Sequence, residues 1–529
     1  MLGSTLTDAR VQTGFSLAFH IVFAVFGVGL PWLLIVTEGR WLRTGDAVWL
    51  ALTRKWSRVM AVLFAIGAVS GTVLSFEFGL LWPAFMARYG GVLGLPFTLE
   101  AFAFFAEAIF VGLYLYGWKR LSPRAHWLTL WPIAISGTLS TLFIVTANAW
   151  MNVPTGIKEV GGKVVSAEPL APLTGPGALP ESLHMLLAAF MCTGGVVAAV
   201  YAVGMLRGRR DAYHRRGFRV GLVTVLAAAP VQLVVGDLAA RVVEKYQPAK
   251  LAAMEGLAHT RDHAPLTLGG VYDPHTGKTR FGIEIPDGLS LLTGFRTDKT
   301  IRGLDILPAK EQPATPVVHL AFDTMVGAGT AILGLATLLA AVALRRRRRG
   351  IRPLIPLSRP WVAAGALTGP AAMFAMLAGW EVTEAGRQPW MVYGRMTVRE
   401  AATTSGGIEW SLIATVLVYL GLATALVLIL RRLATGAPPG LAVDGDMPTR
   451  LDPGSAGFAS PSAEHVQDAA VADSTANAEH TAGTEHIDSC GHATSTHKQD
   501  AASAESLAGR EHIASSAHTA HPEPEGAPR

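Results

Sequence analysis

The stretch LPFTLEAFAFFAEAIFVGLYLYGW occupies residues 95–118, and its only charged residues are Glu100 and Glu107. An α-helix needs about 20 largely apolar residues to cross the hydrocarbon core of a bilayer, so this stretch predicts a membrane-spanning helix. Eight further runs of similar character lie on either side of it. The sequence therefore predicts an all-α, polytopic membrane bundle of nine transmembrane helices. The predicted spans are 13–37, 57–81, 95–118, 127–151, 181–206, 218–240, 316–344, 361–381 and 408–431.

The composition of the whole chain agrees with a membrane protein. Of its 529 residues 50% are hydrophobic and only 16% are charged, whereas about a quarter of a soluble globular chain is charged. The two cysteines, Cys192 and Cys490, exclude a disulfide framework and a Cys-x-x-Cys metal site. The net charge of +5 comes mostly from arginine clusters between apolar runs, which favours a topology signal over nucleic-acid binding.

Lysine and arginine concentrate in alternate connections between the predicted spans. Clusters follow the first, third, fifth, seventh and ninth spans, the densest being the run 345–349. Because cytoplasmic loops carry the excess of basic residues, we expect the N-terminus outside and the C-terminus in the cytoplasm. Arg387, Arg395 and Arg399 lie in an outer connection, and cations that break the rule need a specific reason.

Two polar segments stand apart from the spans. Residues 241–315 form an outer connection too long for a simple turn. From residue 433 the chain is poor in large apolar residues and carries eight histidines between His465 and His521. Such a segment cannot bury enough surface to offset its ordering entropy, so we expect 433–529 to be a disordered His-rich cytoplasmic tail, with weak transition-metal capture as the alternative.

Ionisable side chains inside the predicted spans are the candidate functional residues, because a bilayer makes them costly. With a rise of about 1.5 Å per residue, the potential metal ligands all fall in the outer half of the membrane. Imidazole with thioether is a known axial pair for haem iron, whereas a single buried histidine is as often a satisfied core residue. The set comprises His20, Glu77, Glu100, Glu107, His184, His319 and Met325, with Glu381 and Glu384 at the outer end of the eighth span.

Glu100 and Glu107 lie seven residues apart, which places them on nearly the same helix face, two turns apart in depth. Carboxylates that step into the membrane can relay protons. The alternative is a pair of neutral carboxylic acids hydrogen-bonded between helices.

The segment GWEVTEAGRQPW at 379–390 resembles the signature of subunit I of the cytochrome bd family of quinol:oxygen oxidoreductases. Further segments agree in order, and the resemblance covers residues 1–432 and all nine predicted spans. They are His20 with its N-terminal context, GTVLSFEFGLLWP at 71–83, ANAWMNVP at 147–154, LHM around His184, QPAKLAAMEG at 247–256 and FDTMVG at 322–327.

The resemblance implies three cofactors: a low-spin haem b, a high-spin haem b and a chlorin-type haem d. By position, His184 and Met325 resemble the axial pair of the low-spin haem. His20 and Glu384 resemble ligands of the other two irons, and Glu100 resembles a further carboxylate there. Arg387, Gln388 and Trp390 resemble the loop that meets haem propionates, with Trp380 among the macrocycles. A buried anion would explain why Arg387 breaks the charge rule.

The outer segment 241–315 resembles the family's quinol loop in its shorter form, in which Lys250 and Glu255 match the pair implicated in quinol oxidation. Such a step needs a base for the quinol protons and a cation for the developing charge. The chain departs from many members at Asp323, which stands two residues before the candidate haem methionine where they carry a cation.

The resemblance thus implies an enzyme of the bacterial plasma membrane, subunit I of a bd-type terminal oxidase. We expect it to oxidise quinol at the outer face, to reduce dioxygen to water, and to draw protons from the cytoplasm through Glu107, building a proton gradient without pumping. Implied partners are subunit II and a small single-span subunit. The alternatives are a haem-free cation transporter and a b-type electron-transfer cytochrome without oxygen chemistry.

Overall fold

The computed structural model describes residues 2–435, so the predicted tail lies almost entirely outside the described residues. Within them, nine helices are long and apolar enough to cross a membrane, which confirms the predicted all-α class. They are α1 (Leu2–Thr44), α2 (Ala47–Leu81), α3 (Pro83–Gly117), α4 with α5 (Pro123–Leu128 and Leu130–Asn152), α7 (Ala178–Leu206), α8 (Ala212–Tyr246), α11 (Thr315–Arg348), α12 (Arg359–Ala385) and α14 (Ile408–Thr435).

Most of these helices extend beyond the predicted spans at one or both ends. Polar caps mark several of the starts: Asp46 accepts a hydrogen bond from the Val48 backbone N–H at the start of α2, and Asp211 accepts one from His214 at the start of α8. Such caps satisfy backbone donors that the first turn leaves free. Hydropathy therefore locates the membrane crossings, while the caps set where the helices begin.

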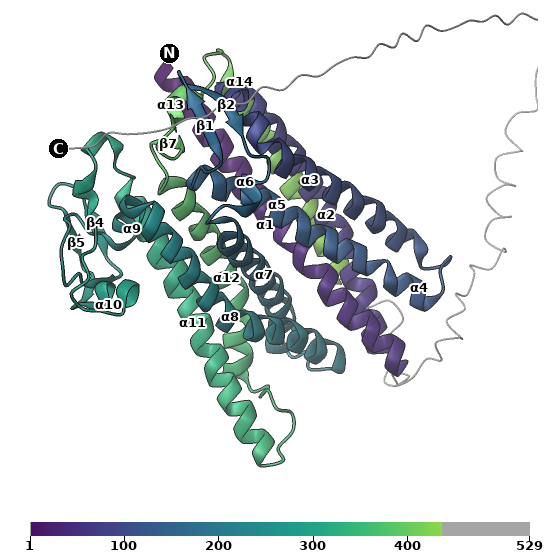
Figure 1. Cartoon of the computed structure of the whole chain (residues 1–529). Helices are drawn as coiled ribbons and strands as arrows, with labels where there is room; N and C mark the ends of the chain where they lie inside the picture. The colour runs from purple at the N-terminus through teal and green to yellow at the C-terminus, as the bar shows by residue number, and fades with distance from the viewer. Residues whose placement is uncertain (1, 436–529) are drawn as a thin grey trace, which may run out of the picture. The chain divides into compact units, whose positions relative to one another are not determined.

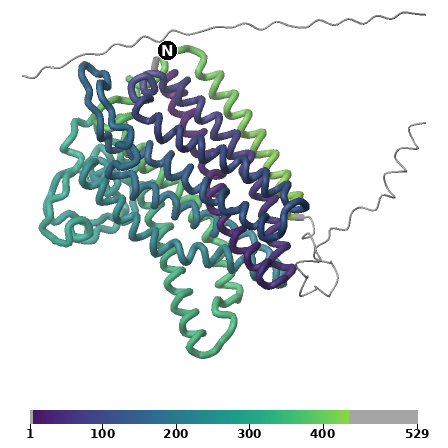
Figure 2. Tube along the Cα trace, turned by 45° about the vertical axis from the view of Figure 1, so that its right-hand side comes forward, coloured from purple at the N-terminus to yellow at the C-terminus, as the bar shows by residue number. Residues whose placement is uncertain are grey.

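The helices form one tightly packed group. α1 contacts α2, α5, α7 and α14, while α7 packs between α8 and α12, and α11 packs on α12 (Figures 1 and 2). One apolar core runs through α1, α2, α3, α5, α7, α8, α11, α12 and α14, and a second one joins the first half of α3 to the end of α5. In contrast, the most apolar windows of α3, α11 and α14 are each only 17% buried, so these helices present broad apolar faces to lipid or to a partner.

The short elements lie in the connections. At the end of the bundle that carries the N-terminus, Figure 1 shows the hairpin β1–β2 (Ile157–Val160, Lys163–Ala167), the strand β7 (Trp390–Val392), which pairs with β8 (Met396–Thr397), and α13 (Val398–Ala401). α6 (Ala171–Thr174) leads into α7. The connections that carry the arginine clusters, including α4, lie toward the opposite end.

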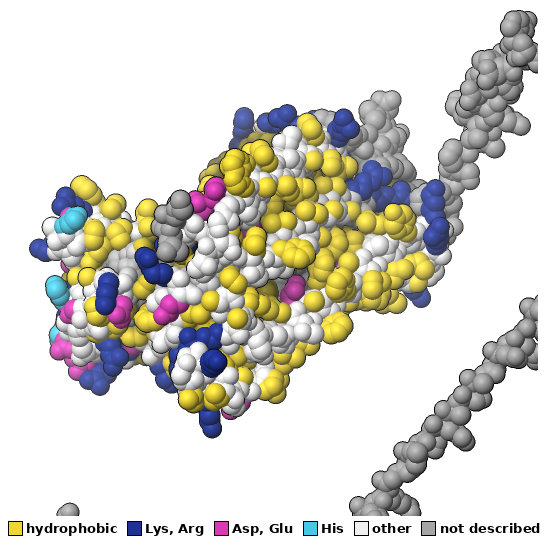
Figure 3. Space-filling model, turned by 90° about the horizontal axis from the view of Figure 1, so that it is seen from above, with side chains coloured by type: hydrophobic (Ala, Val, Ile, Leu, Met, Phe, Trp, Pro, Cys, Tyr) yellow, Lys and Arg dark blue, Asp and Glu magenta, His cyan; other side chains and the backbone are white. Residues whose placement is uncertain are grey.

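The long connection between α8 and α11 is folded. It contains α9 (Pro248–Glu255), the strand pairs β3–β6 (Leu266–Leu268, Ile283–Ile285) and β4–β5 (Val271–Asp273, Lys278–Arg280), α10 (Gly288–Gly294), and the 3₁₀ turns Leu304–Ile306 and Ala309–Glu311. Its buried apolar residues form a core of their own, which extends onto α11 and α12. Figure 3 shows charged and histidine side chains gathered over this side of the molecule, whereas apolar side chains cover much of the helical part.

Candidate functional site

Three of the predicted iron ligands lie against glycines of neighbouring helices. A Cβ atom at Gly71 of α2 would lie 2.9 Å from His20 Cε1, and one at Gly379 of α12 would lie 2.9 Å from Met325 Sδ. At Gly236 of α8 the distance to His184 Cε1 would be 3.2 Å. The absence of a side chain at these positions lets each ligand-bearing helix approach its neighbour closely.

The two histidines have few partners. His20 Nδ1 lies 3.1 Å from Ser70 Oγ. His184 Nε2 lies 3.2 Å from Gln232 Nε2, and its buried Nδ1 has no hydrogen-bond partner in the described structure. The His184 ring therefore keeps one buried nitrogen that no group within residues 2–435 engages.

Glu384 and Arg387 form the core of a polar group at the C-terminal end of α12. Asn148 Nδ2 donates to Glu384 Oε1 at 2.5 Å, and Arg387 donates to Glu384 Oε2 at 2.6 Å. Arg387 is 2% exposed, yet its Nε and Nη1 atoms have no hydrogen-bond partner among residues 2–435. A buried guanidinium left with free donors is a site for a second anion.

Lys250 joins the same group from α9. Its Nζ donates to Asn152 Oδ1 at 2.8 Å and to the Thr383 carbonyl at 3.3 Å. Lys250 is 2% exposed, and burial, followed by the Arg387 charge, lowers the pKa of its amine far below the ordinary value. Glu181 of α7 belongs to the group as well, since its carboxyl group interacts electrostatically with Lys250, Arg387 and Glu384. After the predicted orientation of the chain, we call the set Asn148, Asn152, Glu181, Lys250, Glu384 and Arg387 the outer polar cluster.

The remaining residues of the predicted propionate loop lie close by. Trp380 Nε1 donates to Met185 Sδ at 3.2 Å, which keeps the indole between α7 and α12. Gln388 follows Arg387 in the turn that ends α12, and the Trp390 N–H donates to the Arg387 carbonyl as β7 begins.

Glu100 and Glu107 lie on the side of α3 that faces α5. Ser140 Oγ donates to Glu100 Oε1 at 3.2 Å. Glu107 is 6% exposed and lies against Gly27 of α1 and Gly137 of α5. The structure thus gives both carboxyl groups polar or glycine-lined surroundings inside the bundle.

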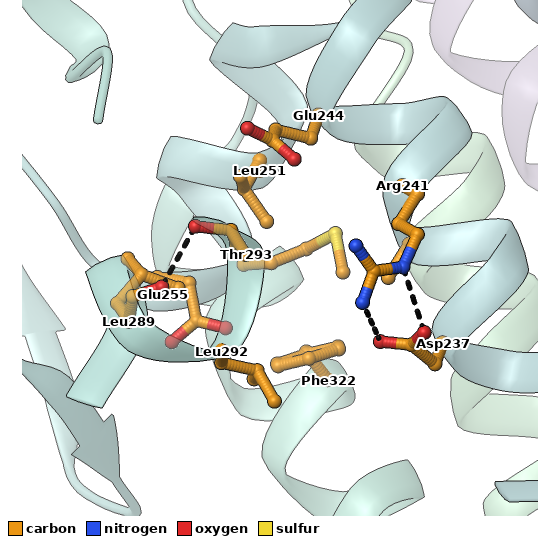
Figure 4. Close-up of a pocket in the computed structure, with 11 residues that line it drawn as sticks. Asp237, Arg241, Glu244, Leu251, Glu255, Leu289, Leu292, Thr293 and Phe322 are labelled. Atoms are coloured by element: carbon orange, nitrogen blue, oxygen red, sulfur yellow. Dashed lines mark hydrogen bonds and ion pairs between the residues drawn. The ribbon is translucent and has the colours of Figure 1, made fainter. Parts of the chain in front are cut away.

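Glu255 lines a different site. A small pocket lies between α8, α9, α10 and α11. In Figure 4, Glu255 lies on one side of it and the Asp237–Arg241 ion pair on the other. Burial, followed by the Asp323 charge, raises the pKa of Glu255 to about 8. The pocket is completed by Ala240, Glu244, Leu251, Met254, Leu289, Leu292, Thr293 and Phe322.

The structure therefore separates two residues that the sequence pairs. Glu255 faces the pocket, whereas Lys250 is not part of its wall and points to the outer polar cluster. Residues five apart on a helix differ by about 140° in direction, so a short helical α9 sends the two side chains to different sides.

The side chains present suit a haem better than a bare metal ion. No group of three or more His, Cys, Asp or Glu in residues 2–435 could hold such an ion. A haem needs only one or two protein ligands, because its macrocycle supplies four nitrogens, and it carries acidic propionates. The unengaged Nδ1 of His184 and the free donors of Arg387 match these two requirements.

Sequence reasoning missed three members of the outer polar cluster. Asn148 and Asn152 lie within ANAWMNVP, one turn apart at the C-terminal end of α5, and this spacing is a signal that could have been used. Glu181 lies in the first turn of α7, where an acidic residue ordinarily indicates a favourable helix end.

The amino-acid sequence is similar to that of known proteins over most of its length. Residues 9–438 match the family model described as cytochrome bd terminal oxidase subunit I. The chain is 33% identical over 430 residues to a putative cytochrome bd menaquinol oxidase subunit I of Bacillus subtilis, covering 80% of this chain and 95% of that protein. It is 29% identical over 509 residues to the cytochrome bd-II ubiquinol oxidase subunit 1 of Escherichia coli, covering 84% and 98%.

A solved structure also matches. The bd oxidase of Geobacillus thermodenitrificans aligns with a TM-score of 0.75 and 33% sequence identity, covering 81% of this chain and 98% of the matched chain.

Proposed function

Because the chain belongs to the cytochrome bd terminal oxidase subunit I family, whose members are quinol oxidases of bacterial membranes that work with a second subunit, we propose that it oxidises quinol in the pocket beside Glu255. The observation that supports this assignment most is the pocket itself. It combines an apolar lining with a buried carboxyl group whose pKa is raised to about 8, which suits a group that must take up and release a proton near neutral pH.

A quinol that becomes a quinone loses two electrons and two protons. Glu255 is placed to accept a proton from a quinol hydroxyl in the pocket, and the Asp237–Arg241 pair offers polar contacts on the opposite wall. Apolar residues such as Leu292 and Phe322 suit the ring and the start of its tail. Release of the protons at this outer site is what the proton gradient requires.

The haem-binding residues are proposed as a set. His184 and Met325 would hold a low-spin haem b, while His20, Glu384 and Glu100 would serve a high-spin haem b and a haem d. When bound, these haems supply electron transfer and the centre at which dioxygen is reduced to water. Arg387 would donate to a propionate, since its Nε and Nη1 have no partner among residues 2–435.

Glu107 and Glu100 would carry protons from the cytoplasmic side. They occupy one face of α3, with Ser140 hydrogen-bonded to Glu100. Uptake from the inside and release on the outside separates charge without a pumping step. A small single-span subunit beside subunit II remains part of this proposal.

The pocket assignment is tested with Glu255→Gln in the isolated complete oxidase. We expect quinol-driven oxygen consumption to fall on the order of a hundredfold, as for loss of a general base, while consumption driven by an artificial electron donor stays close to normal. Glu284→Gln is the matched control, because Glu284 is an exposed carboxylate in the same connection. Equal loss of both activities in Glu255→Gln would contradict the assignment.

The cofactor assignment is tested by absorption spectroscopy. The complete oxidase should show b-type bands and a far-red chlorin band. Met325→Leu should convert the low-spin haem b to a high-spin or missing one and leave the chlorin band. An unchanged reduced spectrum would remove Met325 from the ligand set.

A further inference from the structure

His319 is a buried histidine that the proposed mechanism does not use. It lies in the second turn of α11 and is 0% exposed. Its Nδ1 lies 2.7 Å from the Met254 carbonyl oxygen. A carbonyl only accepts, so Nδ1 carries the hydrogen and the ring donates to Met254.

The Met254 carbonyl needs such a donor. It belongs to the last turn of α9, where carbonyl groups have no partner within the helix. The helix ends at Gly256, whose backbone is left-handed with a φ of +64°, and a Cβ atom there would lie 3.6 Å from His319 Cε1. The imidazole therefore both caps α9 and lies beside its terminal turn.

The second ring nitrogen of His319, Nε2, also has a close neighbour. Nε2 lies 3.3 Å from Asp323 Oδ2, one helical turn further along α11. Neither atom has a hydrogen-bond partner among residues 2–435, so the contact between them is electrostatic. Asp323 thus keeps the ring in the orientation that directs Nδ1 toward Met254.

The turn that the His319 ring contacts forms part of the pocket wall. Met254 and Glu255 both line it, and so does Phe322, which lies between His319 and Asp323 in the sequence. One face of α11 therefore contributes an aromatic wall and, through His319, fixes the backbone that carries the Glu255 carboxyl.

We propose that His319, oriented by Asp323, is a positioning residue for quinol oxidation, which holds the turn Met254–Gly256 so that Glu255 meets the quinol hydroxyl. The inference rests on the proposed function of the pocket. It assigns no contact with quinol to His319 itself.

The experiment compares three variants in the isolated complete oxidase. His319→Phe keeps a ring but lacks a donor. His319→Asn places an amide N–H near the position of Nδ1. Asp323→Asn keeps the shape but removes the charge. For each, quinol kcat/KM, oxygen consumption with an artificial donor, the reduced spectrum, and hydrogen exchange of the segment 249–260 are measured.

We expect His319→Phe to lower quinol kcat/KM by about tenfold, the scale of one lost hydrogen bond, and to speed exchange in 249–260. His319→Asn should restore kcat/KM to within about threefold of the parent, because it restores the donor. The quinol kcat/KM of Asp323→Asn should lie between the values of His319→Phe and His319→Asn. The reduced spectrum and the activity with the artificial donor should stay unchanged in all three.

A double-mutant cycle separates positioning from general support of the structure. In a Glu255→Gln background, His319→Phe should cost little more, since its effect passes through Glu255. If His319→Phe fails to assemble, the same cycle with Asp323→Asn decides. An additive loss, or no rescue by His319→Asn, would overturn the positioning role.

The cycle also distinguishes this inference from the function on which it rests. Normal quinol oxidation in Glu255→Gln alone would refute the pocket and the inference together. Loss of activity in Glu255→Gln with normal activity in His319→Phe and Asp323→Asn would refute only the positioning role.

Discussion

The close contacts between candidate ligands and glycines leave no space for a side chain at those glycine positions. His20 is held between its own helix and the bare backbone at Gly71, where a methyl group would lie 2.9 Å from the ring. The imidazole ring cannot bend away from a clash as the end of a flexible side chain can. The space left at Gly71 therefore determines where the ring lies.

Gly71→Ala should therefore displace His20. Overpacking of this kind costs about 1–3 kcal/mol, and we expect a lower melting temperature together with a smaller haem-to-protein ratio. Gly79→Ala is the control in the same helix, because a Cβ atom there would meet nothing within 4 Å. Equal behaviour of the two variants would show that the close approach at Gly71 has no consequence.

The titration of Glu255 gives a pH dependence with a definite sign. Its pKa is raised to about 8, so the carboxyl is mostly protonated at neutral pH and becomes a base as the pH rises. Quinol kcat/KM should increase as the pH rises through about 8, and it should level off about one pH unit above that value. The rise should be absent in Glu255→Gln, and an identical profile in that variant would assign the titration to another group.

Among the elements, α9 links the two sites. One side of this helix carries Glu255 to the pocket, and another carries Lys250 to Asn152 and the Thr383 carbonyl. We therefore predict that Lys250 supports quinol oxidation by holding α9 against α5 and α12 rather than by facing the pocket.

Lys250→Met tests this role with a side chain of similar length. We expect quinol oxidation to slow by about tenfold, the consequence of one or two lost hydrogen bonds. Oxygen consumption with an artificial donor should change little. If both activities fell together, Lys250 would belong with the haem-binding residues and not with the quinol loop.

Elements with strong periodic signals were predictable, and those set by tertiary contacts were not. The nine crossings follow from apolar length alone, and nine sufficiently long apolar helices are present within residues 2–435. The folded state of 241–315 could not be inferred, because its four strands have only three residues each. The separation of Lys250 from Glu255 becomes predictable only once α9 is known to be helical.

The same distinction applies to the site. Charge and depth singled out His20, His184, Met325 and Glu384 without a structure, and the charge rule marked Arg387. The motif at 379–390 then suggested what Glu384 and Arg387 bind. The bond from Asn148 to Glu384 joins residues 236 positions apart, and no local pattern encodes it. A charged residue in an apolar span is noticed because its burial costs free energy. An uncharged partner such as Asn152 does not stand out in this way, so only its contacts in the structure identify it.

At the scale of the whole molecule, orientation in the membrane is a prediction from arginine placement. Cys192 is fully buried in α7, and Cys490 lies in the predicted cytoplasmic tail, outside the described residues. A membrane-impermeant maleimide should label the chain in inverted vesicles and leave it unlabelled in intact spheroplasts. Cys490→Ser should abolish the signal, whereas labelling of intact spheroplasts would reverse the topology.

The weakly buried faces of α3, α11 and α14 accord with a subunit that works in a complex. The family requires a second large subunit, and the broad apolar surface of this chain gives such a partner room to bind. The transporter and the simple cytochrome, which the sequence alone left open, lose their support once the chain is placed in a family of terminal oxidases.

α11 contacts the pocket through Phe322 and, one turn later, places Met325 against Gly379 of α12. Because α11 is one continuous helix, a shift at one of these contacts also moves the other. We therefore expect substitutions that tilt or translate α11 to alter both the quinol preference and the absorption spectrum of the same variant. Homologues that use a different quinol should show compensating substitutions on the buried face of this helix.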